Sequence, residues 1–338
     1  MSDALDEPNF SARLLAEEAI SRGYQLKSLP QTSLDSHSPI VECIREGKKI
    51  CFRGTATNLD SSLAQVIVSD KITTNEILRS ANLPIPPTFI LPRNEIRLTD
   101  SEELSDIFSR DTLASVRKFL QENISIVIKP SNTDHGNGVT IGISDESNLA
   151  HAIIYAYQKS KDADILMQRM VRGQEFRFLV VNGKTVFVAN RIPPSVIGDG
   201  KRTLRELINS KNADPRRGER YTSPLTKISL ADVAHFIGTE KLDEVPHISE
   251  RVELLKTSNL SLGGDSINMT TSASHFLKNL AARAAVICGL GIAGVDIITE
   301  DISGDSGEII EVNVSPGLRV TVGEIDIAKT IFDELEKI

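Results

Sequence analysis

Aromatic residues are scarce in this sequence: they make up 4% of its 338 residues, and tryptophan is absent. The hydrophobic core must therefore be built mainly from isoleucine, valine, leucine and alanine. Cysteine is also rare, and Cys43, Cys51 and Cys288 show no metal-like spacing. We expect reduced thiols packed as small hydrophobic side chains, which argues against a disulfide-stabilised scaffold or a cysteine-based zinc site.

Long apolar runs are missing as well. Uncharged stretches such as residues 80–92 and 284–295 are far shorter than the ~20 residues that a membrane helix needs. Residues 1–10 are polar and acidic, without the basic start and apolar core of a signal peptide. The net charge of −8 gives no sign of a surface made for nucleic acid. We therefore expect a cytoplasmic protein that binds neither membranes nor nucleic acid.

The first part of the chain predicts a small α/β unit, residues 1–68. Residues 10–22 carry a helical stripe of apolar side chains, and residues 39–44 and 49–53 read as two strands joined by a turn at Glu46-Gly47. The composition, with 40% hydrophobic and 25% charged residues, is that of an ordinary soluble protein. The length allows two or three small domains or one elaborated α/β domain.

Beyond residue 69, helical and strand patterns alternate. Asn182-Gly183 predicts a hairpin turn, and the turn-rich segment 193–260 reads as an elaborated lid or substrate-side segment. We expect helices at residues 70–82, 101–121, 146–160, 203–212, 229–237, 271–289 and 325–337, and strands at 88–91, 124–130, 139–143, 164–170, 175–181, 184–192, 295–298 and 309–314.

Three polar residues interrupt the last two apolar strands. Glu311 and Asn313 are two residues apart and share a face, and a turn near Gly304 sets Asp296 opposite or diagonal to Asn313. Ile310, Val312 and Val314 should point to the other face. Few, hard oxygen ligands are what Mg²⁺ requires, so this cluster predicts a magnesium site. The alternative is an exposed sheet face with ordinary polar residues.

A glycine-containing loop follows Lys129. With Gly136 and Gly138, the loop can bring backbone N–H groups close to phosphate oxygens, and Lys129 adds a compact positive charge. The pattern matches neither the P-loop nor the dinucleotide-binding motif, so a simple glycine turn between strands is an equal alternative. His135 reads as a loop residue rather than a catalytic base.

Residues 166–177 form a strand, a glycine turn and a second strand with Glu175 and Arg177 on one face. Such a hinge could present backbone groups to an adenine while Glu175 reaches a ribose. From the residues alone, a solvated face is an equal alternative.

In this order and at these spacings, the segments resemble the ATP-grasp superfamily from residue 69 to the end of the chain. Within it, they are most similar to the ATP-grasp modules of the fused bacterial glutathione synthetases and of the cyanophycin synthetases. The resemblance is carried by SDK at residues 69–71, VIGDGKRT at 196–203, DPRRG at 214–218, SNLSLGGDSI at 258–267 and EVNVSPGLR at 311–319.

The resemblance implies an α/β (α+β) fold in which two α/β subdomains clasp ATP. Residues 69–170 would be the ATP-lid part, and residues 171–338 the part that binds metal and substrate. The implied cofactors are ATP and two Mg²⁺ ions. Relatives of this type are often homodimers or homotetramers, and no sequence feature decides between these states.

The resemblance also implies roles for individual residues. The ATP phosphates would lie at Lys71, Lys129 and the loop with Gly136 and Gly138; adenine would lie at Gln168, Arg169 and Val171, and ribose at Glu175; the metals at Asp296, Glu311 and Asn313; the transferred phosphoryl group or substrate carboxylate at Arg191, Arg177 and Arg319; and the substrate at Ser258, Asn259, Gly263, Gly264, Ser315 and Gly317. Arg216 and Arg217 would bind an acidic substrate, with a solvated basic turn as the equal alternative.

The sequence departs from related patterns at two residues. Gln168 stands where many relatives carry an acidic residue, and Gly294 where D-alanine–D-alanine ligases have an arginine. The glycine at residue 294 argues against the specificity of a D-alanine–D-alanine ligase. The 338 residues also lack the glutamate–cysteine ligase module of the fused glutathione enzymes and the Mur-ligase-like domain of cyanophycin synthetase. Neither complete activity is therefore expected.

The expected reaction is ATP-dependent joining of a carboxylate to an amine through an acyl-phosphate. Three hypotheses remain open from the sequence. The enzyme acts on small amino acids or short peptides, or it acts on a peptide or protein terminus, or the chain is an ATP-binding regulatory protein that has lost the chemistry. The intact cluster Asp296, Glu311 and Asn313 favours an enzyme over the last of these.

Overall fold

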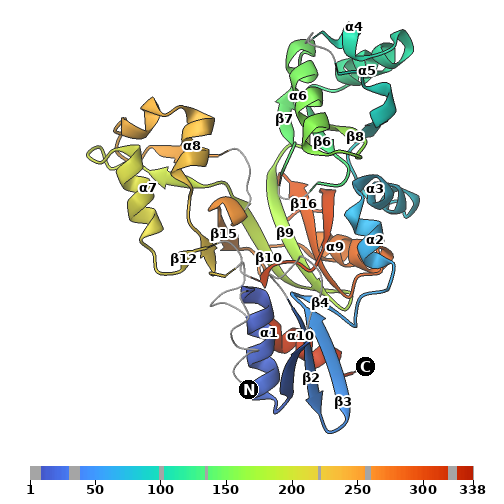
Figure 1. Ribbon diagram of the computed structural model, residues 1–338, viewed down its shortest axis with the longest axis vertical. Helices are drawn as coiled ribbons and strands as arrows, with labels where there is room; N and C mark the ends of the chain where they lie inside the picture. Colours follow the sequence, from blue (N-terminus) through green and yellow to red (C-terminus); the bar gives the residue numbers. More distant parts are fainter. Residues whose placement is uncertain are drawn as a thin grey trace.

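The computed structural model describes residues 9–29, 39–98, 103–133, 136–219, 222–255, 260–318 and 326–337. The described chain has four parts: an N-terminal layer, a central five-stranded sheet, an upper four-stranded sheet and a lobe at the side (Figure 1). No helix in these ranges is long and apolar enough to cross a membrane.

The N-terminal layer is an antiparallel sheet with one helix. Helix α1 (Phe10–Ser21) begins where the side chain of Asn9 accepts hydrogen bonds from two backbone N–H groups. The sheet order is β1 (Gln25–Leu29), β2 (Ile40–Arg45), β3 (Lys48–Arg53) and β4 (Ala56–Thr57). Glu46 and Gly47 have positive φ angles of 53° and 82°, which confirms the predicted turn. The helix and two strands are also confirmed, whereas β1 and β4 were not predicted.

The central sheet holds the order β15 (Asp265–Asn268), β10 (Lys184–Ile192), β9 (Gln174–Val181), β16 (Ile292–Thr299) and β17 (Glu308–Val314). Helix α9 (His275–Ile287) covers one face, where it packs with Phe178 and Val295. The other face packs with α1 and the last helix, α10 (Ile327–Leu335), through Leu179 and Ile292. The two ends of the chain therefore share one hydrophobic core (Figure 1).

The upper sheet holds the order β5 (Thr88–Leu91), β8 (Ile165–Arg169), β6 (Ile126–Pro130) and β7 (Thr140–Ile143). Helices α4 (Leu104–Ile107), α5 (Arg110–Glu122) and α6 (Glu146–Lys159) pack against one face of it. One helix was expected over residues 101–121, but Ser109 caps a new helix start and divides the described part in two.

Two helices link the N-terminal layer to the upper sheet. Helix α2 (Ala64–Ser69) was not predicted, and it spans the boundary expected at residue 68. Helix α3 (Lys71–Ser80) begins at Asp70, whose carboxylate accepts from the N–H groups of Ile72 and Thr73. A short 3₁₀ turn, η1 (Arg93–Glu95), follows β5. The expected division at residue 170 falls directly after β8, between the two sheets.

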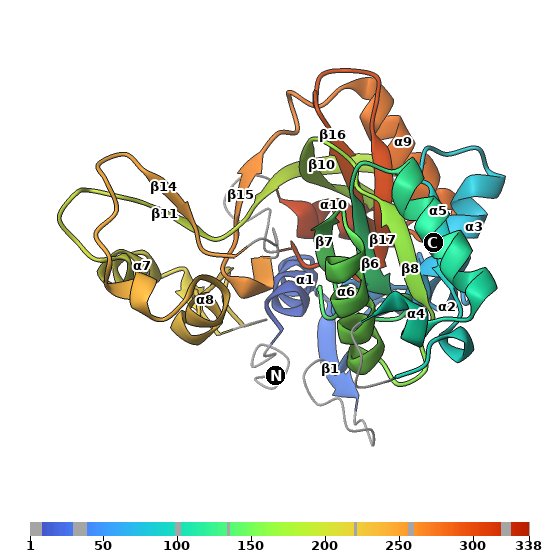
Figure 2. The same cartoon turned by 90° about the horizontal axis from the view of Figure 1, so that it is seen from above.

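The side lobe contains both short helices predicted between residues 193 and 260. It has its own small core around Val196, Leu207 and Val233. Figure 2 shows the lobe projecting from the molecule on the side of β10 and β15. Its elements are β11 (Ser195–Ile197), α7 (Leu204–Asn212), β12 (Arg217–Gly218), β13 (Leu225–Thr226), α8 (Leu230–Ile237), η2 (Glu240–Asp243), β14 (Arg251–Glu253) and η3 (Leu260–Leu262).

Candidate active site

One face of the central sheet carries apolar side chains at one end of its strands and charged side chains at the other. On β9, Leu179 and Val181 face the N-terminal core, and alternation places Glu175 and Arg177 on the same face further along. The neighbouring strand β16 contributes Asp296, which pairs in register with Arg177. This face is therefore apolar at one end and charged at the other, and the charged end is the candidate site.

Asp296 is the buried centre of this charged face. Its side chain is only 2% exposed, and Arg177 binds both of its oxygens, with a distance of 2.7 Å from Nη2 to Oδ2. Arg191 Nη1 lies 3.4 Å from Asp296 Oδ2 and 2.9 Å from Glu175 Oε1. Burial alone would lower the pKa of the Arg177 guanidinium, but Asp296 raises it above its ordinary value. The Arg177 guanidinium therefore stays charged next to this carboxylate.

Strand β17 adds Glu311 and Asn313 to this face. Asp296 lies opposite Glu311, and Gly294 lies opposite Asn313, so Asp296 and Asn313 are diagonal neighbours as the hairpin predicts. Asn313 Nδ2 lies 3.3 Å from Glu311 Oε2 and 3.4 Å from Asp296 Oδ2. Asn313 thus lies within hydrogen-bonding distance of both carboxylates that are predicted to bind metal.

A β-bulge in β17 corrects one expectation. The register shifts between Asp296 and Ile297, whose partners are Glu311 and Ile309, so Ile310 is an extra residue on its strand. As a result Ile309 joins Val312 in the core, and the prediction that Ile310 would occupy that row was wrong. The Ile310 carbonyl instead accepts a hydrogen bond from Lys129 at 3.4 Å.

Two lysines from different elements lie beside Glu311. Lys71, at the start of α3, places its Nζ 3.4 Å from Glu311 Oε1. Lys129, near the end of β6, is 8% exposed, and burial lowers its pKa to about 8. Burial would raise the pKa of Glu311, but Lys71, Lys129 and Arg177 together hold it below its ordinary value. The neighbouring cations therefore keep Glu311 ionised.

The loop after β6 is tied to Lys71. Lys71 Nζ donates to the carbonyl oxygen of Thr133 at 2.5 Å, and the Thr133 hydroxyl donates to Asn137 O at 2.8 Å. Gly136 and Gly138 both have positive φ angles, 77° and 76°, which glycine adopts without strain. Asp134 and His135 lie outside the described residues. The predicted loop glycines thus lie in a turn fastened next to the lysines.

The hinge residues lie at the end of β8. Gln168 is 3% exposed and donates from Nε2 to the Thr88 hydroxyl at 3.0 Å. Arg169 Nη2 binds both oxygens of Glu308, at 2.6 and 2.7 Å, and so joins the upper sheet to β17. Val171 is half-buried just beyond the strand.

The predicted substrate residues fall into separate surroundings. Gly263 and Gly264 are buried, the Ser315 hydroxyl accepts a hydrogen bond from Thr55 N at 3.0 Å, and Gly317 is exposed. Arg319, Ser258 and Asn259 lie outside the described residues. The structure therefore shows no common pocket formed by those members of this set that it describes.

Arg216 and Arg217 differ sharply from each other. Arg216 is exposed and pairs with Asp214, as in the expected basic turn. Arg217 is buried: its Nη1 donates to Thr226 O at 2.8 Å and Gly263 O at 3.1 Å, and its Nη2 binds Asp265. Lys211 binds the same Asp265, so this carboxylate fastens the side lobe to β15.

Replacing Arg217 with methionine should lower the free energy of unfolding by about 2–4 kcal/mol, because two carbonyls and a half-buried carboxylate lose a buried donor. Arg216→Met is the matched control and should cost less than ~1 kcal/mol, because its ion pair is exposed. Urea unfolding measures both. Equal losses in the two variants would contradict the structural role of Arg217.

The oxygen donors of the charged face fit a magnesium ion. Among the described residues, no group of three or more His, Cys, Asp or Glu side chains could hold a metal. The site would instead use the carboxylates of Asp296 and Glu311 and the amide oxygen of Asn313. This small set of hard oxygens suits Mg²⁺, which usually completes its coordination with water and substrate phosphates.

A buried donor on the same face lacks a partner. Arg191 Nε is inaccessible, and no group in the described part of the chain accepts a hydrogen bond from it. Leaving such a donor unsatisfied costs about 1–3 kcal/mol. A phosphate or carboxylate group has the acceptor oxygens that such a donor lacks.

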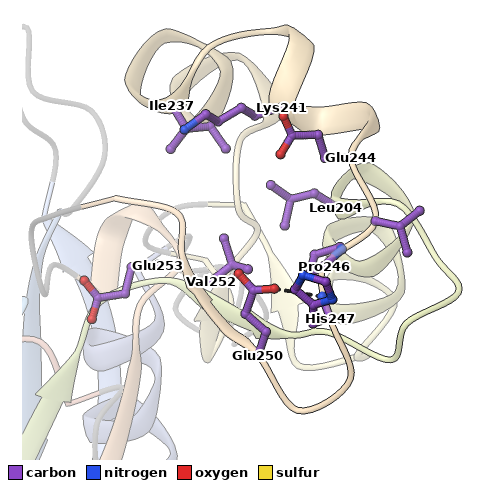
Figure 3. A pocket seen from close by; sticks show the side chains of 10 residues that line it. Leu204, Ile237, Lys241, Glu244, Pro246, His247, Glu250, Val252 and Glu253 are labelled. Atoms are coloured by element: carbon purple, nitrogen blue, oxygen red, sulfur yellow. Dashed lines mark hydrogen bonds between the residues drawn. The ribbon is translucent and has the colours of Figure 1, made fainter.

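A cavity also lies away from the charged face. A cavity of about 350 Å³ lies in the side lobe, between α7, η2 and the β11–β14 pair (Figure 3). Glu250 reaches toward His247 at its edge and accepts a hydrogen bond from the His247 backbone N–H at 2.7 Å. None of its lining residues belongs to the charged face. We place the candidate site on the sheet because the unsatisfied donor and the paired charges are there.

Several contributors were missed by sequence reasoning. The carbonyls of Thr133 and Ile310 leave no mark in a sequence, because every residue has one. Thr88 and Asp265 act on Gln168 and Arg217 from 80 and 48 residues away. Only the pairing of β5 with β8 and the packing of the side lobe bring them together.

Two family models match two separate segments of the chain. The model described as prokaryotic glutathione synthetase, ATP-grasp domain, matches residues 105–203. The model described as RimK-like ATP-grasp domain matches residues 252–335. Together they include the glycine loop, the hinge and the last two strands.

Similar proteins extend the match to nearly the whole chain. Cyanophycin synthetase from Crocosphaera subtropica is 35% identical over 278 residues, 80% of this chain and 30% of that protein. Glutathione biosynthesis bifunctional protein GshAB from Listeria welshimeri is 30% identical over 327 residues, 93% of this chain and 38% of that protein. A crystal structure of a bifunctional glutathione synthetase from Pasteurella multocida covers 99% of this chain and 45% of its own, with a TM-score of 0.69 and 25% identity. The chain thus spans less than half the length of each of these proteins.

Proposed function

Because the chain belongs to the ATP-grasp superfamily, we propose that it joins a carboxylate to an amine at the expense of ATP, acting on small amino acids or short peptides. The observation that carries the proposal is the charged face itself. Lys71, Lys129 and the unsatisfied Nε of Arg191 surround the carboxylates of Asp296 and Glu311. Such a face is suited to an anionic substrate that arrives with a cation.

ATP lies between the two sheets in this proposal. Lys129 and Lys71 hold the phosphates, the loop with Gly136 and Gly138 covers them, and Gln168, Arg169 and Val171 hold the adenine with Glu175 on the ribose. Asp296, Glu311 and Asn313 would hold up to two Mg²⁺ ions. When bound, Mg²⁺ supplies positive charge that stabilises the transferring phosphoryl group.

The reaction proceeds in two steps. A carboxylate oxygen of the acid attacks the γ-phosphorus, and the bond to the β-phosphate oxygen breaks, which gives an acyl-phosphate and ADP. The neutral amine then attacks the acyl carbon, a proton leaves the nitrogen, and phosphate departs with the original carboxylate oxygen. Arg191, Arg177 and Arg319 would neutralise charge on the phosphoryl group or the acid. The substrates would lie toward Gly263, Gly264, Ser315 and Gly317, with Ser258 and Asn259 and the basic pair Arg216 and Arg217 nearby.

The proposal is tested by phosphate release. The full chain is incubated with ATP and Mg²⁺ against a panel of amino acids, γ-glutamyl peptides and dipeptides, and products are identified by mass spectrometry. We expect release that depends on one acid–amine pair and a product of acid plus amine minus water. If no mixture in the panel releases phosphate although the chain binds ATP, the assignment of small amino acids or short peptides as substrates is contradicted. A peptide or protein terminus is then favoured as the substrate. Absence of ATP binding would contradict the proposal as a whole.

The affinity for ATP should fall as the pH rises above about 8. In the free protein, burial lowers the pKa of Lys129 to about 8, so its ammonium is present below this pH and is lost above it. Bound phosphates favour the charged form, so ATP binding above pH 8 must take up a proton. Calorimetry between pH 6.5 and 9.5 without Mg²⁺ should show a loss of up to about tenfold per pH unit. In Lys129→Met this part of the pH dependence should disappear; its persistence would contradict the assignment.

A further inference from the structure

Thr88 is held in a hydrogen-bond chain with a fixed direction. It is the first residue of β5 and lies opposite Gln168 of β8. Its hydroxyl oxygen is 2.9 Å from the Pro86 carbonyl oxygen and 3.0 Å from Gln168 Nε2. The hydroxyl has one hydrogen, and a carbonyl can only accept. Thr88 therefore donates to Pro86 and accepts from Gln168.

This direction settles the orientation of the Gln168 amide. The two ends of a side-chain amide have similar shapes, so their placement follows from the donors and acceptors around them. Because Thr88 can only accept here, Nε2 must face it, and Oε1 faces away. No donor in the described chain bonds this oxygen, and it is not among the fully buried atoms that lack a partner, so a ligand can reach it. Gln168 thus presents its acceptor on the side away from Thr88.

Gln168 lies on the same face of the upper sheet as Lys129. Lys129 pairs in register with Leu166, and Gln168 follows Leu166 by two residues. With the phosphates at Lys129, the other end of a nucleotide lies toward Gln168. Adenine has an exocyclic amino group as a donor, whereas guanine carries a carbonyl oxygen at the same position. An acceptor at Oε1 therefore accepts a hydrogen bond from the amino group of adenine and is repelled by the carbonyl oxygen of guanine.

We infer that Thr88 sets the preference of this site for ATP over GTP by holding the Gln168 amide with its oxygen toward the base. The inference rests on the proposed function and adds a positioning residue to it. It also accounts for the departure at Gln168: a carboxylate accepts in either orientation, but a glutamine needs a neighbour that fixes its amide. Without the Thr88 hydroxyl, the amide is free to turn its Nε2 toward the base.

The test measures the affinities of ATP and of GTP by calorimetry with the full chain, without any acid or amine. Thr88→Val removes the hydroxyl at nearly constant shape, and should lower the ratio of ATP to GTP affinity by about tenfold or more. Thr88→Ser keeps the hydroxyl and should keep the ratio. In Thr88→Val/Gln168→Glu, the carboxylate accepts without help and should restore the ATP preference. A loss of packing alone would weaken both nucleotides equally and leave the ratio unchanged.

The outcomes separate the inference from the proposed function. If the wild-type protein binds ATP but does not prefer it to GTP, or if Thr88→Val keeps the preference, the inference is wrong and the ATP site stands. Failure of the double variant to regain the preference would also overturn it. If the wild-type protein binds neither nucleotide, the proposed function itself is wrong.

Discussion

Glu311→Ala should lower turnover on the order of 10³-fold while the protein remains folded. Glu311 is more exposed than Asp296, and it faces Lys71 and Asn313 and not the core. Its removal takes away a proposed magnesium ligand and leaves two lysines without their nearest negative charge. The core contacts of Ile309 and Val312 on the same strand are unchanged, so the free energy of unfolding should fall by no more than ~2 kcal/mol.

Two further variants make this result specific. Glu311→Gln keeps the shape and removes the charge, and should lose activity as the alanine variant does. Glu146→Ala removes an exposed carboxylate of α6 from its pair with Arg117 of α5 and should retain activity. Turnover is measured with the acid–amine pair found in the panel, and folding by circular dichroism. Full activity in Glu311→Ala would contradict the metal assignment.

Arg177→Met should lower the free energy of unfolding by about 3–5 kcal/mol and also abolish activity. Arg177 provides the closest charge to Asp296, and both side chains are largely buried. Removing the guanidinium leaves the buried carboxylate without its bidentate partner, and the Arg191 guanidinium lies further away, at 3.4 Å. Paired buried charges are stable, whereas a single one is not.

A double substitution separates charge from packing. Arg177→Met/Asp296→Asn removes both charges and should recover most of the lost stability, to within ~2 kcal/mol of the wild-type protein. Activity should stay absent, because a proposed metal ligand is also gone. Urea unfolding of the two single variants and the double variant gives the coupling. If the double variant is as unstable as Arg177→Met, the loss comes from packing and not from the unpaired charge.

Gly294 shows how the site constrains its neighbours. A Cβ atom at this position would lie 2.7 Å from Arg177 Nη1 and 2.9 Å from the Cβ of Pro316. A larger residue would displace the arginine from Asp296. The glycine therefore has a physical reason here, in addition to the contrast with D-alanine–D-alanine ligases.

Local patterns predicted much of the fold. The α/β character and the ATP-grasp fold are confirmed, and the strand expected at residues 88–91 has the predicted bounds. Turn position and alternation also predicted that Asp296 lies opposite or diagonal to Asn313, and the structure shows the diagonal arrangement. The bulge at Ile310 was not predicted. Ile309 and Ile310 are both apolar, so alternation alone does not show which of them faces the core.

Features that depend on distant residues were beyond the sequence. The sequence left Arg216 and Arg217 either as binders of an acidic substrate or as a solvated basic turn, yet Arg217 is buried against Asp265 and the carbonyls of Thr226 and Gly263. Strand β1 was missed because its residues, QLKSL, do not alternate cleanly, and its pairing with β2 supplies the stability that its own pattern does not indicate.

The central claim is that the carboxylate is activated by transfer of the γ-phosphoryl group, and transfer of ¹⁸O tests it most directly. The acid found in the panel is labelled with ¹⁸O in its carboxylate, and the released phosphate is analysed by mass spectrometry. The account predicts that each phosphate carries one ¹⁸O from the acid, with ADP and the amide as the other products. Label in AMP with release of pyrophosphate, or phosphate that contains no label, would contradict it.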